Sequence, residues 1–509
     1  MSLHRWLSSS KPGQPRWLSS SKPGRLDRLD ELGTLDERGT RWTRRFRRMV
    51  PALAAAAVLG LSACSAVGVG SEGSGSGSAQ SAALEVAEGT GVWDASEVHE
   101  ISVEVDEATV SEMLQTYADT DEKEWISATV TIDGTTYENV GLRLKGNSSL
   151  RGADVDSEPT ELPWLIRLDK FVDGQTADGY SEFVVRSNST TTAINEAVAL
   201  DLLREAGLAS EYAIASSFSV NGADAALRLV VQNLDETWEE ENFSTTGLLY
   251  KSESEGDWSW RGEDAESYVD VFDQETGEDD MTPLIELLDF LNNSSDEEFA
   301  ESLGDHLDTE AFARYLAFEE LIDNFDDIDG PGNNSFLRWD ADSDSFTVVA
   351  WDHNLAFGGF GGGFGGGFGG DGERPEPPEG FEPPEDGEMP AMPEGAEMPQ
   401  GERPTDAPEF GGAGGAGGGP GGRSNVLVER FSEVEEFAAL IEQASSDLRA
   451  ELYDSGLALE AVDRWEALLT EQASDLVDAE TVASEAQAVR DSIEGAGQDE
   501  ESGTPSPPA

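Results

Sequence analysis

The chain has 509 residues and a formal net charge of −72, with 104 acidic and only 32 basic side chains. So strong a negative charge disfavours binding to nucleic acid and to anionic membrane surfaces, and it favours basic partners. Because the chain has a single cysteine, we expect neither an intramolecular disulfide nor a cysteine-based zinc site.

Residues 44–64 (RRFRRMVPALAAAAVLGLSAC) combine a basic cluster, an apolar run and Leu-Ser-Ala-Cys. The apolar run is too short for a comfortable transmembrane helix and is typical of a secretory signal. Leu-Ser-Ala-Cys resembles the bacterial lipobox, in which the signal is cut before the cysteine and the thiol is lipidated. We therefore predict a leader over residues 1–63, lipid attachment at Cys64, and an extracytoplasmic protein that is lipid-anchored to the cell membrane.

Three later segments are too rich in Gly, Ser or Pro to form a core. They are a tether over residues 64–90, an insertion over 358–422 and a tail over 494–509, and we predict that all three are disordered. What remains, 91–357 and 423–493, is predicted to form one α+β domain that the insertion interrupts.

The first half of this domain is predicted to be rich in strands, because apolar and polar residues alternate in several runs. The runs are HEISVEVD (99–106), EWISATVTIDGTTYENVGLRLKG (124–146), PWLIRLDKF (163–171), SEFVVRS (181–187), SSFSVNG (216–222) and AALRLVVQNL (225–234). Before the last two, the run 191–208 predicts a helix that is capped by Thr191 or Thr192 and ends at Gly207.

Beyond about residue 280 the pattern is mostly helical, apart from a predicted hairpin, FLRWD…FTVVAWD. Strands first and helices later predict two lobes that meet at a cleft. Around the hairpin, Asp326 follows a predicted helix, Asn333 and Asn334 precede the first strand, and Asp352 ends the second. Carboxylate and amide oxygens at the ends of packed elements are a reasonable divalent-cation site, and they suit magnesium better than zinc.

The run NFD…NNSFLRW…VVAWDHNLAFG resembles the signature of the CotH family, the spore-coat H-type proteins with an atypical protein-kinase fold. GLRLKGNSS, NEAVALDLLREAGL and GLLYKSE are similar to further landmarks of that family. The resemblance covers about residues 95–357 and, more weakly, the helices after 423. It implies a two-lobed kinase-like fold, with a strand-rich N-lobe that carries one key helix and a mostly helical C-lobe.

Carried over residue by residue, the resemblance implies that Asp326 is the catalytic-loop acid beside the acceptor hydroxyl. Asp352 would hold Mg²⁺ (or Mn²⁺) against the phosphates of ATP, with Asn334, or alternatively Asn333, as a second metal ligand. Phosphoryl transfer depends mainly on positioning and on charge neutralisation, so these groups would carry most of the chemistry.

The resemblance also implies that a cation on the nucleotide is oriented by a glutamate of the key helix. Glu196 shares a helix face with the apolar Leu200 and Leu203, so we expect it to have a charged partner. Arg167 occupies the strand position where the family usually has lysine, and Lys145 is the other candidate; with Glu196, both are predicted to contact the nucleotide.

Basic residues gather where so acidic a protein would need them to hold ATP. Six fall between positions 143 and 186: Arg143, Lys145, Arg151, Arg167, Lys170 and Arg186. The alternative is that they form a structural layer of ion pairs under the sheet.

The resemblance implies a kinase that transfers the γ-phosphate of ATP to Ser or Thr hydroxyls of a protein. With the net charge and the lipobox-like sequence, we expect that acceptor to be basic, Ser-rich and extracytoplasmic, and we expect the kinase to be a monomer. Three departures from the family pattern leave a non-catalytic relative as an alternative: Arg167 replaces lysine, the loop from Asp326 to Asn334 is long, and Asn354 replaces an acid. Such a relative would be a surface scaffold or adhesin, which need not bind Mg-ATP. A third hypothesis is a phosphotransferase that acts on a cell-wall polymer.

Overall fold

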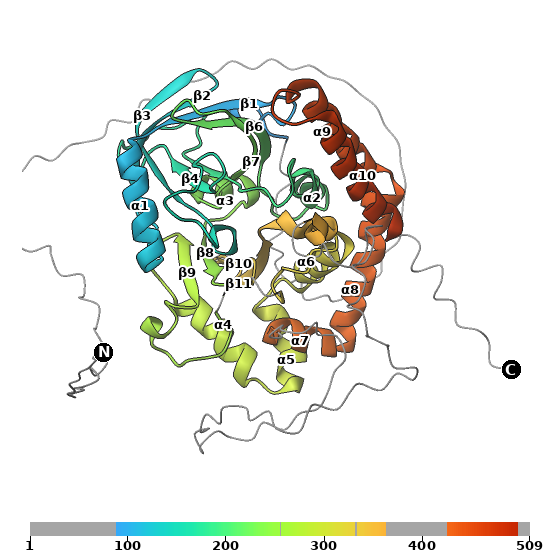
Figure 1. Cartoon of the computed structure of the whole chain (residues 1–509). Coiled ribbons are helices and arrows are strands. Elements are labelled where there is room, and N and C mark those ends of the chain that lie inside the picture. Colours follow the sequence, from blue (N-terminus) through green and yellow to red (C-terminus); the bar gives the residue numbers. More distant parts are fainter. Residues whose placement is uncertain (1–87, 255, 331–332, 363–424, 497–509) are drawn as a thin grey trace, which may run out of the picture. The chain divides into compact units, whose positions relative to one another are not determined.

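The computed structural model describes residues 88–254, 256–330, 333–362 and 425–496 (Figure 1). The predicted leader and Cys64 lie outside the described residues, as do nearly all of the predicted tether, insertion and tail, so these features stay predictions. Within the described ranges, no helix is long and apolar enough to cross a membrane.

Seven strands close into a barrel in the order β1-β2-β3-β4-β5-β7-β6. Neighbouring strands are antiparallel except β1 and β6, which are parallel. The alternation seen in the sequence explains this sheet, since Ile101 and Val103 of β1 are buried while Glu100 and Glu104 are exposed. The strands predicted in the first half are confirmed, with shifted ends: β1 His99–Glu104, β2 Ile126–Ile132, β3 Thr135–Leu144, β4 Trp164–Arg167, β5 Glu182–Val185, β6 Ala213–Val220 and β7 Ala226–Gln232.

A second, four-stranded sheet has the order β11-β10-β8-β9. It contains the predicted hairpin, as β10 (Ser335–Asp340) and β11 (Ser345–Ala350), together with β8 (Gly247–Ser252) and β9 (Phe272–Thr276). The sequence pattern did not predict β8 and β9 as strands. Neither alternates cleanly: β8 is buried along nearly its whole length, and β9 is short and largely polar.

Helix α2 (Ile194–Glu205) is the most deeply buried helix element of the first half, with ten of its twelve residues buried. It packs against β6, against the segment after β11 and against two helices near the C-terminus. Its predicted end at Gly207 is confirmed, because that glycine has a φ of 68° and donates its N–H to the carbonyl of Arg204.

The start of α2 differs from the prediction. The residue that precedes the first helical turn is Ala193, with a φ of 53°, rather than Thr191 or Thr192. The backbone N–H groups of both threonines bond instead to the carboxylate of Glu485, far along the chain. The hydroxyl of Thr192 still accepts the N–H of Ile194, at 3.3 Å.

The later half is mostly helical, as predicted. Outside the barrel and the second sheet, the helices are α1 Glu107–Thr120, α3 Glu236–Asn242, α4 Thr282–Asn293, α5 Asp296–Ser302, α6 Thr309–Leu321, α7 Val426–Glu433, α8 Glu435–Leu448, α9 Leu457–Gln472 and α10 Ala479–Gly495. A 3-10 segment, η5 (His353–Gly362), follows β11, with a kink at Ala356–Gly358. The fold is thus the predicted mixture of a strand-rich sheet and helices, while the two-lobed kinase-like arrangement stays a prediction.

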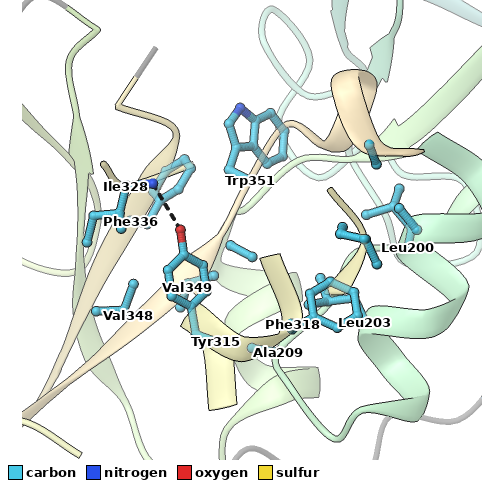
Figure 2. Close-up of a cluster of buried hydrophobic side chains, with 14 of the residues drawn as sticks. Leu200, Leu203, Ala209, Tyr315, Phe318, Ile328, Phe336, Val348, Val349 and Trp351 are labelled. Carbon is cyan, nitrogen blue, oxygen red and sulfur yellow. Dashed lines mark hydrogen bonds between the residues drawn. The ribbon is translucent and has the colours of Figure 1, made fainter. Parts of the chain in front are cut away.

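Figure 2 shows a buried cluster that joins α2, α6 and the second sheet. Leu200 and Leu203 come from α2, and Phe318 from α6. On the other side lie Phe336 of β10 and Trp351, which immediately follows β11. Because these side chains are almost fully buried, α2 and the end of β11 share one packed core, and moving either one disturbs the other.

Candidate functional site

A cleft of about 870 Å³ brings together most of the residues that the sequence predicted. Those that line it are Lys145, Glu196, Asp326, Asn334 and Asp352. They lie just after β3, in α2, in the loop after α6, just before β10 and just after β11. Residues far apart in sequence therefore meet at one place.

Asp352 lies where the apolar strand β11 reaches the cleft. It is the second residue after β11, and its φ of 69° lies in the left-handed region, which residues other than glycine rarely adopt. This conformation turns the chain from β11 into η5 and leaves the side chain about a quarter exposed, at the cleft. The Asp352 carboxylate contacts the guanidinium of Arg186.

Arg186 is the charged partner of Glu196. It follows β5 directly and reaches Glu196 with two nitrogens, at 2.5 Å and 3.1 Å, while it also contacts Asp352. Although burial opposes the effect, the two carboxylates raise the pKa of Arg186, so it stays charged. The expectation that Arg167 or Lys145 pairs with Glu196 is therefore wrong.

Arg167 lies at the wrong end of the β4–β5 hairpin to reach Glu196. It is the last residue of β4 and pairs in register with Glu182, at the start of β5, whereas Arg186 follows the end of β5. Its guanidinium bonds to Asp169 at 2.8 Å and to Glu182 at 2.9 Å, with 39% of the side chain exposed. Arg167 is also absent from the lining of the cleft.

Lys145 does lie in the cleft, in contact with neutral groups. Its Nζ donates to Oδ1 of Asn233 at 2.9 Å and lies 5.4 Å from the centre of the Trp351 ring. Burial, assisted by the nearby Lys251 and Arg143, lowers the pKa of Lys145 to about 8. A fraction of the Lys145 side chains is therefore neutral in mildly alkaline solution.

Trp351 also faces Arg186, whose guanidinium carbon lies 5.8 Å from the ring centre. One indole thus lies beside both cations, and cation–π attraction favours keeping them there. Further basic residues line the same cleft: Lys123, Arg143, Arg151 and Lys251. Of the six basic residues that gather in the sequence, Arg143, Lys145, Arg151 and Arg186 line this cleft, and their contact with ATP stays a prediction.

The loop that carries Asp326 is held by buried polar contacts. The Ile328 N–H donates to the hydroxyl of Tyr315 on α6, at 3.1 Å, as Figure 2 shows. The side-chain amide of Asn324 donates to Glu319, at 2.8 Å, and that of Asn334 donates to the carbonyl of Asp326, at 2.9 Å. The loop is longer than family resemblance leads one to expect, yet it is fixed at both ends.

The structure distinguishes between the two asparagines. Asn334 lines the cleft, whereas Asn333 is buried and bonds to Ser252 and to the carbonyl of Glu253. The side-chain oxygen of Asn333 accepts the indole N–H of Trp258, at 3.2 Å. Asn333 is therefore committed to holding the loop on β8, and Asn334 is the candidate ligand.

Behind Asp352, a buried histidine joins the site to α6. Nε2 of His353 lies 3.1 Å from Glu319, and both side chains are almost completely buried. Burial lowers the pKa of His353, but Glu319 more than compensates and raises it to about 9. His353 is thus cationic at neutral pH, and its ion pair ties the residue next to Asp352 to the helix that precedes the Asp326 loop.

The donor set fits a magnesium ion that is shared with a nucleotide. No group of three or more His, Cys, Asp or Glu residues in the described part of the chain is arranged to hold a metal. Mg²⁺ is commonly bound through one or two carboxylates, with phosphate oxygens and water as its other ligands. Asp352 and Asn334 supply two oxygen donors at the same cleft, which suits that mode rather than an all-protein cage.

A family model described as CotH kinase protein matches residues 142–494. The chain belongs to the CotH kinase protein family. The match runs from the end of β3 through α10 and therefore includes every cleft residue predicted from the sequence. No curated protein shows significant similarity to the chain. The family resemblance seen in the sequence is confirmed. By its family, the chain is a kinase-like protein.

Arg186 and Trp351 both line the cleft, and sequence reasoning assigned no specific role to either of them. Arg186 was counted among six basic residues, and Trp351 was part of the family motif. A signal was present, since Arg186 directly follows a strand and precedes α2 by only a few residues. That short connection keeps the end of β5 near the start of the helix.

Proposed function

We propose that this chain transfers the γ-phosphate of ATP to a Ser or Thr hydroxyl of a protein, with Mg²⁺ or Mn²⁺ as the metal. The observation that carries the proposal is the contact of Arg186 with both Glu196 and Asp352, in a cleft that also holds Asp326 and Lys145. A buried cation held by a helix glutamate beside a carboxylate is the arrangement with which protein kinases hold a triphosphate and its metal. Membership of a kinase-like family supports the same reaction.

The cations of the cleft would bind and orient the triphosphate. Glu196 fixes the guanidinium of Arg186, and Trp351 lies beside both Arg186 and Lys145, so two positive groups are preorganised before the nucleotide enters. Asp352 and Asn334 would hold the metal, which neutralises phosphate charge when bound.

Asp326 would orient the acceptor. Its carboxylate accepts the hydroxyl proton as the hydroxyl oxygen bonds to the γ-phosphorus; the bond from that phosphorus to the β–γ bridging oxygen breaks, and ADP leaves. The Asn334 amide donates to the carbonyl of Asp326, so the candidate metal ligand and the candidate base are held by one hydrogen bond.

For the acceptor we propose a basic, Ser-rich protein outside the cytoplasm. The support is the net charge of −72, which attracts cationic partners, and the lipobox-like sequence that ends at Cys64. Lipid anchoring through Cys64 and a monomeric state belong to the same proposal, and the charge disfavours a nucleic-acid partner.

The test separates binding from transfer. Asp352→Ala should abolish Mg-ATP binding in calorimetry, because the triphosphate loses the metal that links it to the protein. Asp326→Ala should bind Mg-ATP normally, while radiolabel transfer to a basic Ser-rich protein falls by about two to four orders of magnitude. Asp342→Ala, in the exposed turn between β10 and β11, is the matched control and should change neither. Failure of the wild type to bind ATP with any divalent metal overturns the kinase function and leaves the scaffold hypothesis.

A further inference from the structure

The loop that leads into α2 is held by a carboxylate from the other end of the chain. Glu485 of α10 accepts the backbone N–H groups of Thr191 and Thr192, each at 2.9 Å, and the hydroxyl of Thr192, at 2.5 Å. Ala193 offers no side-chain cap of its own. A charged acceptor that takes three donors is a strong and directional contact.

A second contact holds the same helix near its other end. The carboxylate of Asp201 accepts the indole N–H of Trp465 on α9, at 2.6 Å, and also contacts Arg464 of α9. Both Asp201 and Trp465 are buried. The two helices α9 and α10 pack against each other and lie beside α2, so one helical hairpin contacts α2 near both ends (Figure 1).

Glu196 lies between these two contacts, and α2 also supports the chain next to Asp352. The side-chain amide of Asn195 donates to the carbonyl of Asn354, at 2.8 Å, and more weakly to that of Ala356. Helix α10 packs on the same segment, η5. The position of α2 therefore affects Glu196 directly and Asp352 through η5.

We propose that the α9–α10 hairpin positions α2 for nucleotide binding, with Glu485 and the Asp201–Trp465 pair as positioning residues. The inference rests on the proposed function. Its physical basis is that Glu196 must meet Arg186 in a bidentate geometry, which a small shift or rotation of α2 would break. Apolar packing alone tolerates such shifts better than hydrogen bonds at both ends of a helix do.

Two substitutions remove the directional contacts. Glu485→Ala deletes the acceptor at the start of α2, and Trp465→Phe keeps an aromatic ring while it deletes the N–H donor to Asp201 together with part of the buried volume of the indole. Glu494→Ala is the matched control, because Glu494 is an exposed glutamate on the same helix. The readout is the Kd for Mg-ATP, measured by calorimetry in the full chain.

A double-mutant cycle separates positioning from general stability. Glu485→Ala and Trp465→Phe should each weaken Mg-ATP binding about tenfold in the wild-type background. In a Glu196→Gln background each should cost less than about twofold, because the geometry they maintain no longer serves an ion pair. Glu494→Ala should have no effect in either background. Equal losses in both backgrounds, or no loss at all, overturn the proposal.

Hydrogen exchange distinguishes this inference from the proposed function. Without nucleotide, Glu485→Ala and Trp465→Phe should speed amide exchange about tenfold in α2 and in residues 352–357, but not in β2 and β3. If the wild type binds no Mg-ATP, the proposed function fails, and the exchange rates alone then decide whether the hairpin positions α2. Unchanged exchange in α2 and η5 contradicts the inference, whatever the nucleotide result.

Discussion

Two arginines on the β4–β5 hairpin have the same chemistry and very different surroundings. Arg167 is 39% exposed and pairs with Asp169 and Glu182, whereas Arg186 is 12% exposed and contacts Glu196 and Asp352. Exposed pairs contribute less than about 1 kcal/mol because water and salt screen them. Breaking a buried pair by removing one partner typically costs about 3–5 kcal/mol, because the remaining charge is left uncompensated. The two arginines differ in surroundings because they lie at opposite ends of the β4–β5 hairpin, and only the end that carries Arg186 reaches α2.

The largest expected effect comes from removing Arg186, with removal of Arg167 as the matched comparison. Arg186→Gln should weaken Mg-ATP binding by at least about a hundredfold, because it removes a cation that we propose binds phosphate and leaves Glu196 unpaired. Arg167→Gln should stay within about threefold of the wild type, since that side chain does not line the cleft. Calorimetric titration of both variants checks the comparison.

Because Arg186→Gln risks unfolding, Arg186→Lys is the second variant. It keeps the charge but loses the forked geometry that reaches Glu196 with two nitrogens. We expect a folded protein with about tenfold weaker binding, the cost of roughly one charge-assisted hydrogen bond. Equal losses in the Arg186 and Arg167 variants would show that Arg186 has no special role.

A smaller effect is expected from a change in pH, because Lys145 changes its charge near pH 8. Lys145 is charged below its pKa of about 8 and neutral above it, so the proposed contact with phosphate should form at pH 7 and weaken as the pH rises. Mg-ATP affinity should fall about tenfold between pH 7 and pH 9, as the charged fraction of Lys145 falls. Lys145→Arg, which cannot deprotonate in this range, should flatten the profile. A wild-type profile that is level across this range would contradict the assignment of Lys145 to the nucleotide.

The smallest expected effect concerns the polar contacts that connect Lys145 to Arg167 through Asn233 and Glu182. Asn233 accepts from Lys145 and donates to Glu182, at 2.7 Å, and Glu182 pairs with Arg167. Asn233→Ala should release Lys145 and change Mg-ATP affinity by about threefold, the scale of one neutral hydrogen bond. Asn221→Ala is a control for asparagine loss outside the cleft, in the turn between β6 and β7. If Asn233→Ala and Asn221→Ala behave alike, the link has no functional weight.

Much of the fold followed from local patterns in the sequence. Alternation predicted the barrel strands, and Gly207 predicted the end of α2, because each rests on the chemistry of a few adjacent residues. Strands β8 and β9 were missed because burial on β8 is nearly continuous and β9 is polar. Periodicity has no signal in either case.

The carboxylates that line the cleft were predictable, as was Lys145, but the cation that pairs with Glu196 was not. Asp326 and Asp352 stand in a recognisable motif at the ends of elements, and both line the cleft. Choosing among six basic residues required knowing which end of the β4–β5 hairpin approaches α2, and strand alternation reports the face of a residue but not that end. The contact of Glu485 with Thr191 spans 294 positions in the sequence, so no local pattern could have indicated it.

The described domain is made of two stretches of chain, 88–362 and 425–496, that contact each other directly. The second stretch contributes α8, which packs on α6, and α9, whose Trp465 is buried against Asp201 of α2. Asn425 begins it with an N–H bonded to Asp329, in the loop that carries Asp326. The two stretches should therefore reassemble when they are produced as separate polypeptides, so that the proposed kinase activity could be made conditional on the meeting of two fragments.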